Sequence, residues 1–342
     1  MIKSGKTPRV TILMPVYNAA AYVREAVESI LAQTFKNFEL LAINDGSTDA
    51  TAHILRTFDD KRVRVLDNNE NLGIIQTMNL GLDAARSEYV ARMDGDDICH
   101  HNRLELQVRF LDTNPGVDIC GGSISVFGKG KRPSILKHPT DDNYIRCAFL
   151  SHNPMANPTV MFRREPVLAT GERYLSDFEW VEDYDFFERL SNTLRFGNLP
   201  DVLLDYRIHD TQVTQQKASA MRDGAARVRR RQLLRLMPQL TTAQQQLHEK
   251  AIDMDQAITK DELHHIEHWL LHLSTCMGEH GGYDAQAISK FVAQRWINIC
   301  NRAKPCRTTW MRYRASMLRD AKAFGKWNEW KLSIKCLIGS LE

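Results

Sequence analysis

The first half of the chain alternates short apolar runs of strand length with stretches of helical periodicity. The apolar runs, rich in Val, Ile and Leu, are Arg9–Met14, Phe38–Ile43, Arg62–Leu66 and Glu88–Met93. The helical stretches between them are Ala19–Gln33, Thr48–Phe58 and about Ile74–Ala85. Repeated strand–helix–strand units predict an α/β fold with a mixed, mainly parallel sheet. Ligands bind such sheets beyond the carboxyl ends of the strands, so a site is expected in the loops after Met14, Ile43 and Met93.

The chain changes character near residue 210, where strand signals fade. Helical patterns then cover Ala225–Leu236, Lys260–Leu273, Ala285–Cys300 and Thr309–Phe324, and Thr259–Glu262 has the residues of a capping box. Residues 1–210 carry 24 Lys and Arg against 30 Asp and Glu, a net charge of −6. Residues 211–342 carry 21 against 12, a net charge of +9. We expect an α/β domain over residues 1–215 and a mainly α-helical extension over 216–342 with different partners.

Composition excludes several classes of protein. The seven cysteines are scattered and form no Cys-x-x-Cys pair, which predicts neither a zinc site nor a disulfide scaffold. No segment approaches the roughly 20 apolar residues that span a bilayer. Met1–Arg9 has no apolar core of a secretory signal, so we expect a cytoplasmic protein with reduced thiols.

Polar residues follow three of the predicted strands: Pro15–Asn18, Asn44–Asp49 and Asp94–Asp97. The chain has no Gly-x-Gly-x-x-Gly after the first strand and no Walker loop, which argues against dinucleotide and P-loop chemistry. Three carboxylates within Asp94-Gly95-Asp96-Asp97 repel one another unless a cation lies among them. A divalent cation with oxygen ligands is the natural partner, and a solvated acidic turn or helix cap is the alternative.

These motifs, in this order, resemble the inverting glycosyltransferases of family 2, which have a GT-A fold. The segments that carry the resemblance are Pro15–Asn18, Ser29–Thr34, Asn44–Asp49, Arg92–Asp97, Trp180–Asp185 and Tyr206–His209. Together they cover about residues 8–210. The family often has an Arg-Asn pair after the third strand, whereas Asn71-Leu72-Gly73 occupies that place here and has no arginine.

The resemblance implies a nucleotide-sugar pocket. The residues that would form it are Pro15, Val16, Tyr17, Asn18, Asp45, Gly73, Asp94, Gly95 and Arg207. Tyr17 would stack on the base, and Asp45 would accept a ring N–H, a contact that favours uracil. Asp94 would approach the ribose or a metal-bound water.

The resemblance also implies a divalent cation, Mn²⁺ or Mg²⁺. Asp96 would ligate it directly and bridge it to the donor diphosphate, with Asp94 beside it and Asp97 in support. His209 is a further candidate ligand, although a histidine in a polar loop is often only a hydrogen-bonding residue. Arg207 could instead neutralise the diphosphate.

Asp183 is the expected general base, and Glu182 is the alternative because adjacent carboxylates cannot be ranked by sequence. A single base on the face opposite the leaving group gives inversion without a protein nucleophile. A helix N-terminal charge is the structural alternative for Asp183. In the family, the region from His152 to Thr159 borders the acceptor sugar, and a plain loop and strand is the competing interpretation.

Three features of the second half have structural and functional interpretations. His264, His268 and His272 share a helical face but lack a carboxylate or cysteine that completes a metal site, and Arg227–Arg231 lies in a helical pattern without a nucleic-acid module. From Lys304 onward nine Lys and Arg face three acids, interleaved with aromatics. Such a basic helical region either binds an anionic membrane surface or packs on the first domain.

We therefore expect an inverting, metal-dependent hexosyltransferase. It would move a hexose or N-acetylhexosamine from a UDP-sugar to a saccharide acceptor, on a polyprenyl-diphosphate carrier, in surface polysaccharide, O-antigen or lipopolysaccharide synthesis. The expected location is the cytoplasm, with peripheral attachment to the inner membrane face and no nucleic-acid partner. The alternatives are a non-catalytic GT-A module that binds nucleotide or glycan, and a sugar nucleotidyltransferase, although the basic triphosphate loop of the latter is absent.

Overall fold

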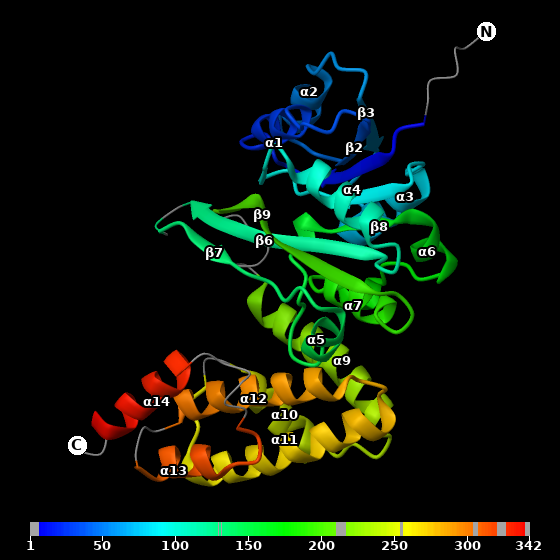
Figure 1. Cartoon of the computed structure of the whole chain (residues 1–342). Coiled ribbons are helices and arrows are strands. Elements are labelled where there is room, and N and C mark those ends of the chain that lie inside the picture. The colour runs from blue at the N-terminus through cyan, green and yellow to red at the C-terminus, as the bar shows by residue number, and fades with distance from the viewer. Residues whose placement is uncertain are drawn as a thin grey trace. The chain divides into compact units, whose positions relative to one another are not determined.

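The computed structural model describes residues 7–128, 130, 132–209, 217–253, 256–303, 307–319 and 326–338. Packing divides the chain into two compact units, both visible in Figure 1. The sheet unit comprises the described residues up to Ile145 and from Asn153 to Ala225. The helical unit comprises Arg146–His152 and the described chain from Ala226 onward. A short segment in the middle of the sequence therefore belongs to the C-terminal helices.

Within the described residues, nine strands form one sheet in the order β3-β2-β1-β4-β8-β6-β9-β5, with β7 paired to β6. The strands are β1 Val10–Val16, β2 Phe38–Asp45, β3 Val63–Asn68, β4 Tyr89–Arg92, β5 Ile98–Cys99, β6 Ile119–Gly128, β7 Ser134–Leu136, β8 Met161–Arg163 and β9 Phe196–Ile208. Strands β3, β2, β1 and β4 are mutually parallel, and β6 is parallel to β9. Strand β8 runs antiparallel between β4 and β6. The expected α/β fold with a mixed, mainly parallel sheet is confirmed.

The helices of the sheet unit connect these strands. They are α1 Val23–Leu31, α2 Thr51–Arg56, α3 Ile74–Ala84, α4 Arg103–Thr113, α5 Asp142–Ala148, which continues into the helical unit, α6 Arg164–Ala169 and α7 Glu182–Leu190, with 3-10 turns at Asn157–Thr159 and Ser176–Phe178. Helix α1 begins at Val23 instead of Ala19. The N–H groups of Ala19 and Ala20 donate to Thr51 and Asp49 in the next loop, so the chain turns here before the helix begins.

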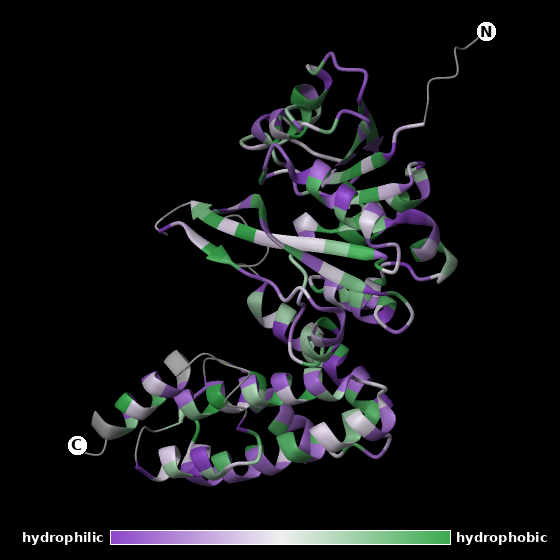
Figure 2. Cartoon of the chain, in the orientation of Figure 1, coloured by the Kyte–Doolittle hydropathy of each residue, from purple (hydrophilic) through white to green (hydrophobic). Residues whose placement is uncertain are grey.

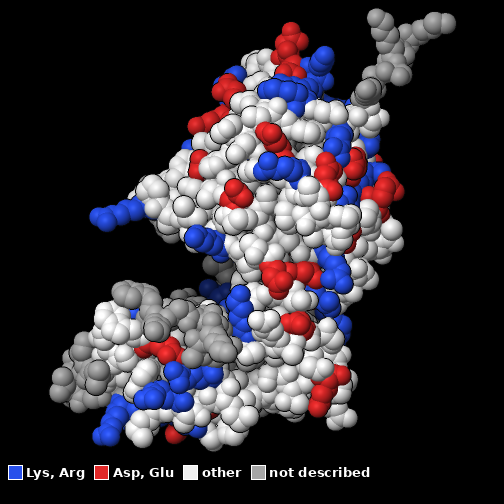
Figure 3. Space-filling model, in the orientation of Figure 1, with Lys and Arg blue, Asp and Glu red and all other residues white. Residues whose placement is uncertain are grey.

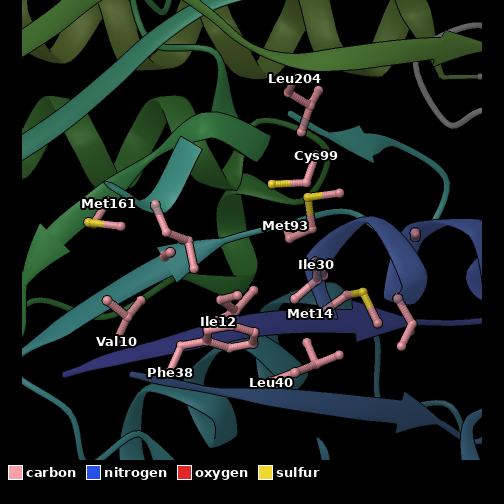
Figure 4. Packing of buried hydrophobic residues seen from close by; sticks show 14 of the residues in the cluster. Val10, Ile12, Met14, Ile30, Phe38, Leu40, Met93, Cys99, Met161 and Leu204 are labelled. Carbon is pink, nitrogen blue, oxygen red and sulfur yellow. The ribbon is translucent and has the colours of Figure 1, made fainter. Parts of the chain in front are cut away.

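Every residue of β1 and β2 is buried, as expected for parallel strands covered on both faces. Alternate residues of β1 point to one face, where Ile12 and Met14 pack with Leu40 and with Ile30 of α1 (Figure 4). On the other face, a Cβ at Gly81 of α3 would lie 2.2 Å from Cδ1 of Leu13, so glycine lets this helix pack closely on the sheet. This packing fixes the carboxyl ends of the parallel strands, where the site lies.

The helical unit contains α9 Ala218–Leu236 from residue 226 onward, α10 Thr242–Ile252, α11 Lys260–His280, α12 Ala285–Arg302, α13 Arg307–Ala315 and α14 Lys326–Ile338. The predicted capping box at Thr259 and Glu262 is present at the start of α11. Figure 2 shows apolar and polar positions interleaved along α11 and α12, and the buried apolar face includes Trp269 and Trp296. None of the described helices is both long and apolar enough to cross a bilayer.

The sequence prediction for the C-terminal helices needs one correction. The helix expected over Thr309–Phe324 ends at Ala315 and is followed by a turn at Met317 and Leu318. Residues 304–306, 320–325 and 339–342, which include part of the predicted basic face, lie outside the described residues.

Candidate active site

Hydrogen bonds lock the loops after β1 and β2 together. Asn18 has a φ of 48°, in the left-handed region, and its Oδ1 accepts from the Thr48 N–H at 2.9 Å. Its own N–H donates to Ser47 Oγ at 3.0 Å. The Asn18 side chain therefore shapes the loop pair. Tyr17, one residue earlier, is 48% exposed, which leaves its ring accessible for stacking on a base.

Asp45, the last residue of β2, organises the loop that precedes α3. Its buried carboxylate accepts from Asn68 Nδ2 at 2.7 Å, from the Leu72 N–H at 2.9 Å and from the Gly73 N–H at 3.0 Å. Gly73 has a φ of 83°, a conformation that glycine adopts without strain. Three donors leave at least one lone pair on this carboxylate, so it can accept one more N–H from a ligand.

The acidic loop Asp94–Asp97 follows β4 and lies against the end of β1. Pro15 and Val16, the last residues of β1, are buried. A Cβ at Gly95 would lie 2.6 Å from Cγ1 of Val16, so a larger residue at this position would push the loop away. The structure thus brings together the first and third of the polar motifs found in the sequence, Pro15–Asn18 and Asp94–Asp97.

A buried cation holds the start of the acidic loop. Arg92 is 5% exposed and its Nη2 lies 2.5 Å from Asp94 Oδ1. Its carbonyl oxygen accepts from Nη2 of a second buried arginine, Arg103, at 2.7 Å. Arg92 also lowers the pKa of Asp183, against a larger rise caused by burial. The positive charge of the Arg92 guanidinium therefore acts on both the acidic loop and the expected base.

The end of β9 and His209, which follows it, contact the acidic loop. His209 Nε2 is 3.0 Å from Asp96 Oδ2. The Arg207 N–H donates to Asp97 Oδ1 at 2.9 Å, and Arg207 Nε donates to the Asp96 carbonyl at 2.8 Å. The Arg207 guanidinium also pairs with Glu25 of α1, so here it is engaged by protein groups.

The acidic loop is an environment that attracts a cation. Burial, with Asp94 and Asp96 nearby, raises the pKa of Asp97 to about 9. Burial also raises the pKa of Asp96, and His209 opposes that rise. Asp97 Oδ2 is buried and has no hydrogen-bond partner among the described residues. The local charge is therefore under-compensated by the protein.

These residues fit a divalent cation that substrate helps to bind. No group of three or more His, Cys, Asp or Glu side chains in the described part of the chain is arranged as a complete metal site. Mg²⁺ at substrate phosphates takes only one or two carboxylates from the protein, and its remaining ligands are phosphate and water oxygens. Asp96, with Asp94 and the His209 imidazole beside it, supplies such a partial set.

Glu182 and Asp183 begin α7. The Asp183 carboxylate accepts from the Tyr184 N–H at 2.7 Å and from Asn153 Nδ2 at 3.0 Å. Burial raises its pKa. Burial and the Asp183 charge raise the pKa of Glu182 to about 8. Trp180, just before the helix, has a φ of 73°, a strained conformation of the kind that clusters at functional sites.

Sequence reasoning gave no individual role to Arg92, Asn153 and Glu25, which the structure brings to the site, although Asn153 begins the region near His152–Thr159 that was expected beside the acceptor. Arg92 was visible two positions before Asp94, a spacing that puts both side chains on one face of an extended chain. Asn153 and Glu25 gave no usable signal, because their partners Asp183 and Arg207 lie 30 and 182 residues away in the sequence.

Comparison with known proteins shows the family of the chain. The glycosyl transferase family 2 model matches residues 11–170. A glycosyltransferase of Haemophilus influenzae is 32% identical over 234 residues, which are 65% of this chain and 72% of the relative. One of Rickettsia typhi is 28% identical over 241 residues, 66% of this chain and 72% of the relative.

A solved structure extends the comparison to the fold. S. aureus TarS 1–349 in complex with UDP-GlcNAc aligns with a TM-score of 0.56 at 16% identity, covering 97% of this chain and 92% of that one. The chain therefore belongs to glycosyl transferase family 2, and its sheet unit has the GT-A fold.

Proposed function

We propose that this glycosyltransferase moves a hexose or N-acetylhexosamine from a UDP-sugar to a saccharide acceptor, with inversion at the transferred carbon. The observation that carries the proposal is the convergence of four polar elements on one sheet edge. The loops after β1 and β2 meet through Asn18, the end of β2 meets the loop before α3 through Asp45, and the loop after β4 lies against the end of β1 at Gly95. The Asp183 carboxylate lies within the field of the same Arg92 that pairs with Asp94.

The donor's nucleotide would bind between the β1 and β2 loops. The exposed Tyr17 ring suits a base, and the Asp45 carboxylate suits an acidic ring N–H such as that of uracil. TarS, which has the same fold, was solved with UDP-GlcNAc, so the fold accommodates this class of donor. Pro15, Val16, Asn18, Gly73 and Gly95 would shape the walls.

The leaving diphosphate would bind at the acidic loop through Mn²⁺ or Mg²⁺ held by Asp96, with Asp94 and His209 in support. When bound, the cation supplies a Lewis acid that stabilises the negative charge of the departing diphosphate. Arg207 would add a second positive charge there once it leaves Glu25.

Asp183 would act as the general base. Its carboxylate takes the proton of the acceptor hydroxyl while that oxygen forms a bond to the anomeric carbon. The bond from that carbon to the diphosphate oxygen breaks, and the nucleoside diphosphate leaves. A raised pKa suits this task, because a base whose pKa lies nearer neutrality binds the proton more strongly.

We place donor binding and chemistry in residues 1–215 and attachment to a membrane or partner in residues 216–342. The acceptor would be a saccharide on a polyprenyl diphosphate at the cytoplasmic face of the membrane, in lipopolysaccharide or O-antigen assembly. The supporting observation is the exposure of Met311 in α13, Met317 in the turn after it and Trp330 in α14, two helices that carry basic residues. Figure 3 shows Lys and Arg gathered on that part of the helical unit.

Vesicle co-sedimentation tests the membrane part of this proposal. The double variant Arg314→Glu, Met317→Asp should bind vesicles with anionic lipid at least tenfold more weakly than the unchanged chain. Arg195→Glu, an exposed charge reversal in the sheet unit, is the matched control and should bind normally. Equal binding by all three proteins would remove the membrane role.

A donor screen tests the catalytic part. Release of UDP from a panel of UDP-sugars is measured with Mn²⁺ and with EDTA, and GDP-sugars serve as the competing class. We expect turnover of UDP-sugars that EDTA abolishes and that Asp96→Asn reduces at least a hundredfold. Asp83→Asn removes an exposed carboxylate of α3 and should leave the rate unchanged. Turnover unaffected by EDTA, or confined to GDP-sugars, would contradict the proposal.

A further inference from the structure

The Asn153 side chain is aimed at Asp183 and its orientation is fixed. Its Oδ1 accepts from the Met155 N–H at 3.1 Å, across the intervening proline. Its Nδ2 donates to Asp183 Oδ2 at 3.0 Å. Because only the amide nitrogen can donate, the bond to the Met155 N–H excludes the flipped orientation. Asp183 therefore faces a neutral donor.

The loop that begins at Asn153 is held on its far side as well. The Pro154 carbonyl accepts from Asn198 Nδ2 at 3.2 Å and lies 3.2 Å from His138 Nδ1. Asn198 is 2% exposed, so this support is buried. Asn153 thus approaches Asp183 from a backbone that has little freedom to move away.

Immediately before Asn153, the chain belongs to the helical unit. The Phe149 carbonyl accepts from Nε2 of Gln232 in α9 at 2.8 Å. The Leu150 carbonyl lies 2.7 Å from Nε2 of His248 in α10. Both anchoring side chains are almost completely buried, at 2% and 1% exposure. These bonds hold the backbone of Phe149 and Leu150 to α9 and α10.

We propose that Asn153 is a positioning residue for the catalytic base Asp183. This inference rests on the role proposed above for Asp183.

Loss of the Asn153 donor should change how the rate depends on pH. A donor to the ionised carboxylate favours ionisation, so Asn153→Ala should raise the pKa of Asp183 by about 1 unit. The other groups that face Asp183 are Arg92, Asp94, Glu182 and Tyr174, and all of them remain in the variant. The acid limb of log kcat against pH should move to higher pH by the same amount.

The experiment measures kcat and KM for UDP release from pH 5 to pH 9. In Asn153→Ala, kcat should be lowered at pH values below the acid limb and should return to near the normal value at pH values above it. The KM for the donor should stay within about twofold. Asn153→Asp, which adds a negative charge, should move the limb further in the same direction. Asn114→Ala is the matched control, because the Asn114 side chain donates to the Phe110 carbonyl of α4 and is not among the groups that face Asp183. A uniform loss at all pH values, or an unmoved limb, would overturn the role of Asn153.

The outcomes separate this inference from the function it rests on. If the unchanged chain releases no UDP from any donor, the proposed function fails. If it turns over and Asp183→Asn is inactive, but Asn153→Ala keeps the normal limb, only the inference fails.

Discussion

The sheet unit and the helical unit differ in how they accommodate their carboxylates. In the sheet unit, burial raises the pKa of Asp96, Asp97, Glu182 and Asp183, all of which lie at the candidate site. In the helical unit, Lys250 lowers the pKa of Glu262 to about 2, and Arg319 lowers that of Glu329. The sheet unit also has ordinary ion pairs, such as Arg62 with Asp60.

The difference indicates which carboxylates lower the folding stability of the chain and are available for catalysis. A buried carboxylate without a matching cation costs folding free energy, and such groups gather at sites that use them. A carboxylate paired with Lys or Arg at a helix end contributes a little stability and has no chemical task. The contrast favours a catalytic role for the buried carboxylates of the sheet unit and a structural role for the paired carboxylates of the helical unit.

The largest expected effect is on the base. Asp183→Asn should lower kcat by about 10²- to 10⁴-fold, because the amide cannot take a proton from the acceptor. UDP binding, measured by calorimetry, should stay within about twofold. Glu182→Gln should cost less than Asp183→Asn if the assignment between the two neighbours is right. The reverse ranking would move the base to Glu182.

The second effect is on pH dependence. The base acts in its ionised form, so the rate should rise with pH through the pKa of Asp183. Because burial raises that pKa, the acid limb should lie above the value of about 4 that is usual for aspartate. A profile of kcat from pH 4 to pH 9 measures this. A limb at or below pH 4 would mean that Asp183 is well compensated and the contrast between the units is false.

The third effect concerns stability in the acidic loop. Asp97 is buried with an oxygen that lacks a partner among the described residues. Because burial raises the pKa of Asp97 to about 9, its carboxyl group must take up a proton on folding at neutral pH, which lowers stability. Asp97→Asn removes this cost and keeps an acceptor for the Arg207 N–H, so the free energy of unfolding in EDTA should rise by about 2 kcal/mol. Denaturant titration measures the change. The same variant should lose activity, and a destabilised Asp97→Asn would break the comparison.

The smallest effect concerns the stability contributed by a paired carboxylate of the helical unit. Glu262 closes the capping box with Thr259 and pairs with Lys250. Glu262→Ala should therefore lower the free energy of unfolding by about 1 kcal/mol, most of it from the cap. Calorimetric unfolding measures the shift, while kcat should be unchanged. Glu165→Ala, which removes an exposed carboxylate of α6, serves as the control for a change of charge alone.

Much of the sheet unit could be predicted from the sequence, because the patterns that indicate strands, and the loops after them, lie within short stretches of the chain. Apolar runs of strand length gave β1 to β4, and the loops after them gave Asp45 and Asp96. What could not be predicted depends on contacts between distant parts of the chain. The Arg207 contact with Glu25 and the Asn153 contact with Asp183 leave no periodic signal.

The membership of Arg146–His152 in the helical unit was equally invisible. The segment is short, and its partners Gln232 and His248 come about 80 to 100 residues later. The end of α13 at Ala315 was missed for a related reason, since the apolar spacing continues past the residue at which the helix stops. Periodicity predicts a helical face, while packing decides where the helix ends.

The segment Arg146–His152 also affects how the chain is made. A ribosome releases these residues well before residues 226–303, where their partners lie. Domains usually fold in the order of their synthesis, but Phe149 and Leu150, fully buried in the finished protein, must wait for helices that have not yet emerged. Nascent chains therefore expose an apolar segment that chaperones can bind. A chimaera that exchanges the C-terminal helices has to exchange this segment with them.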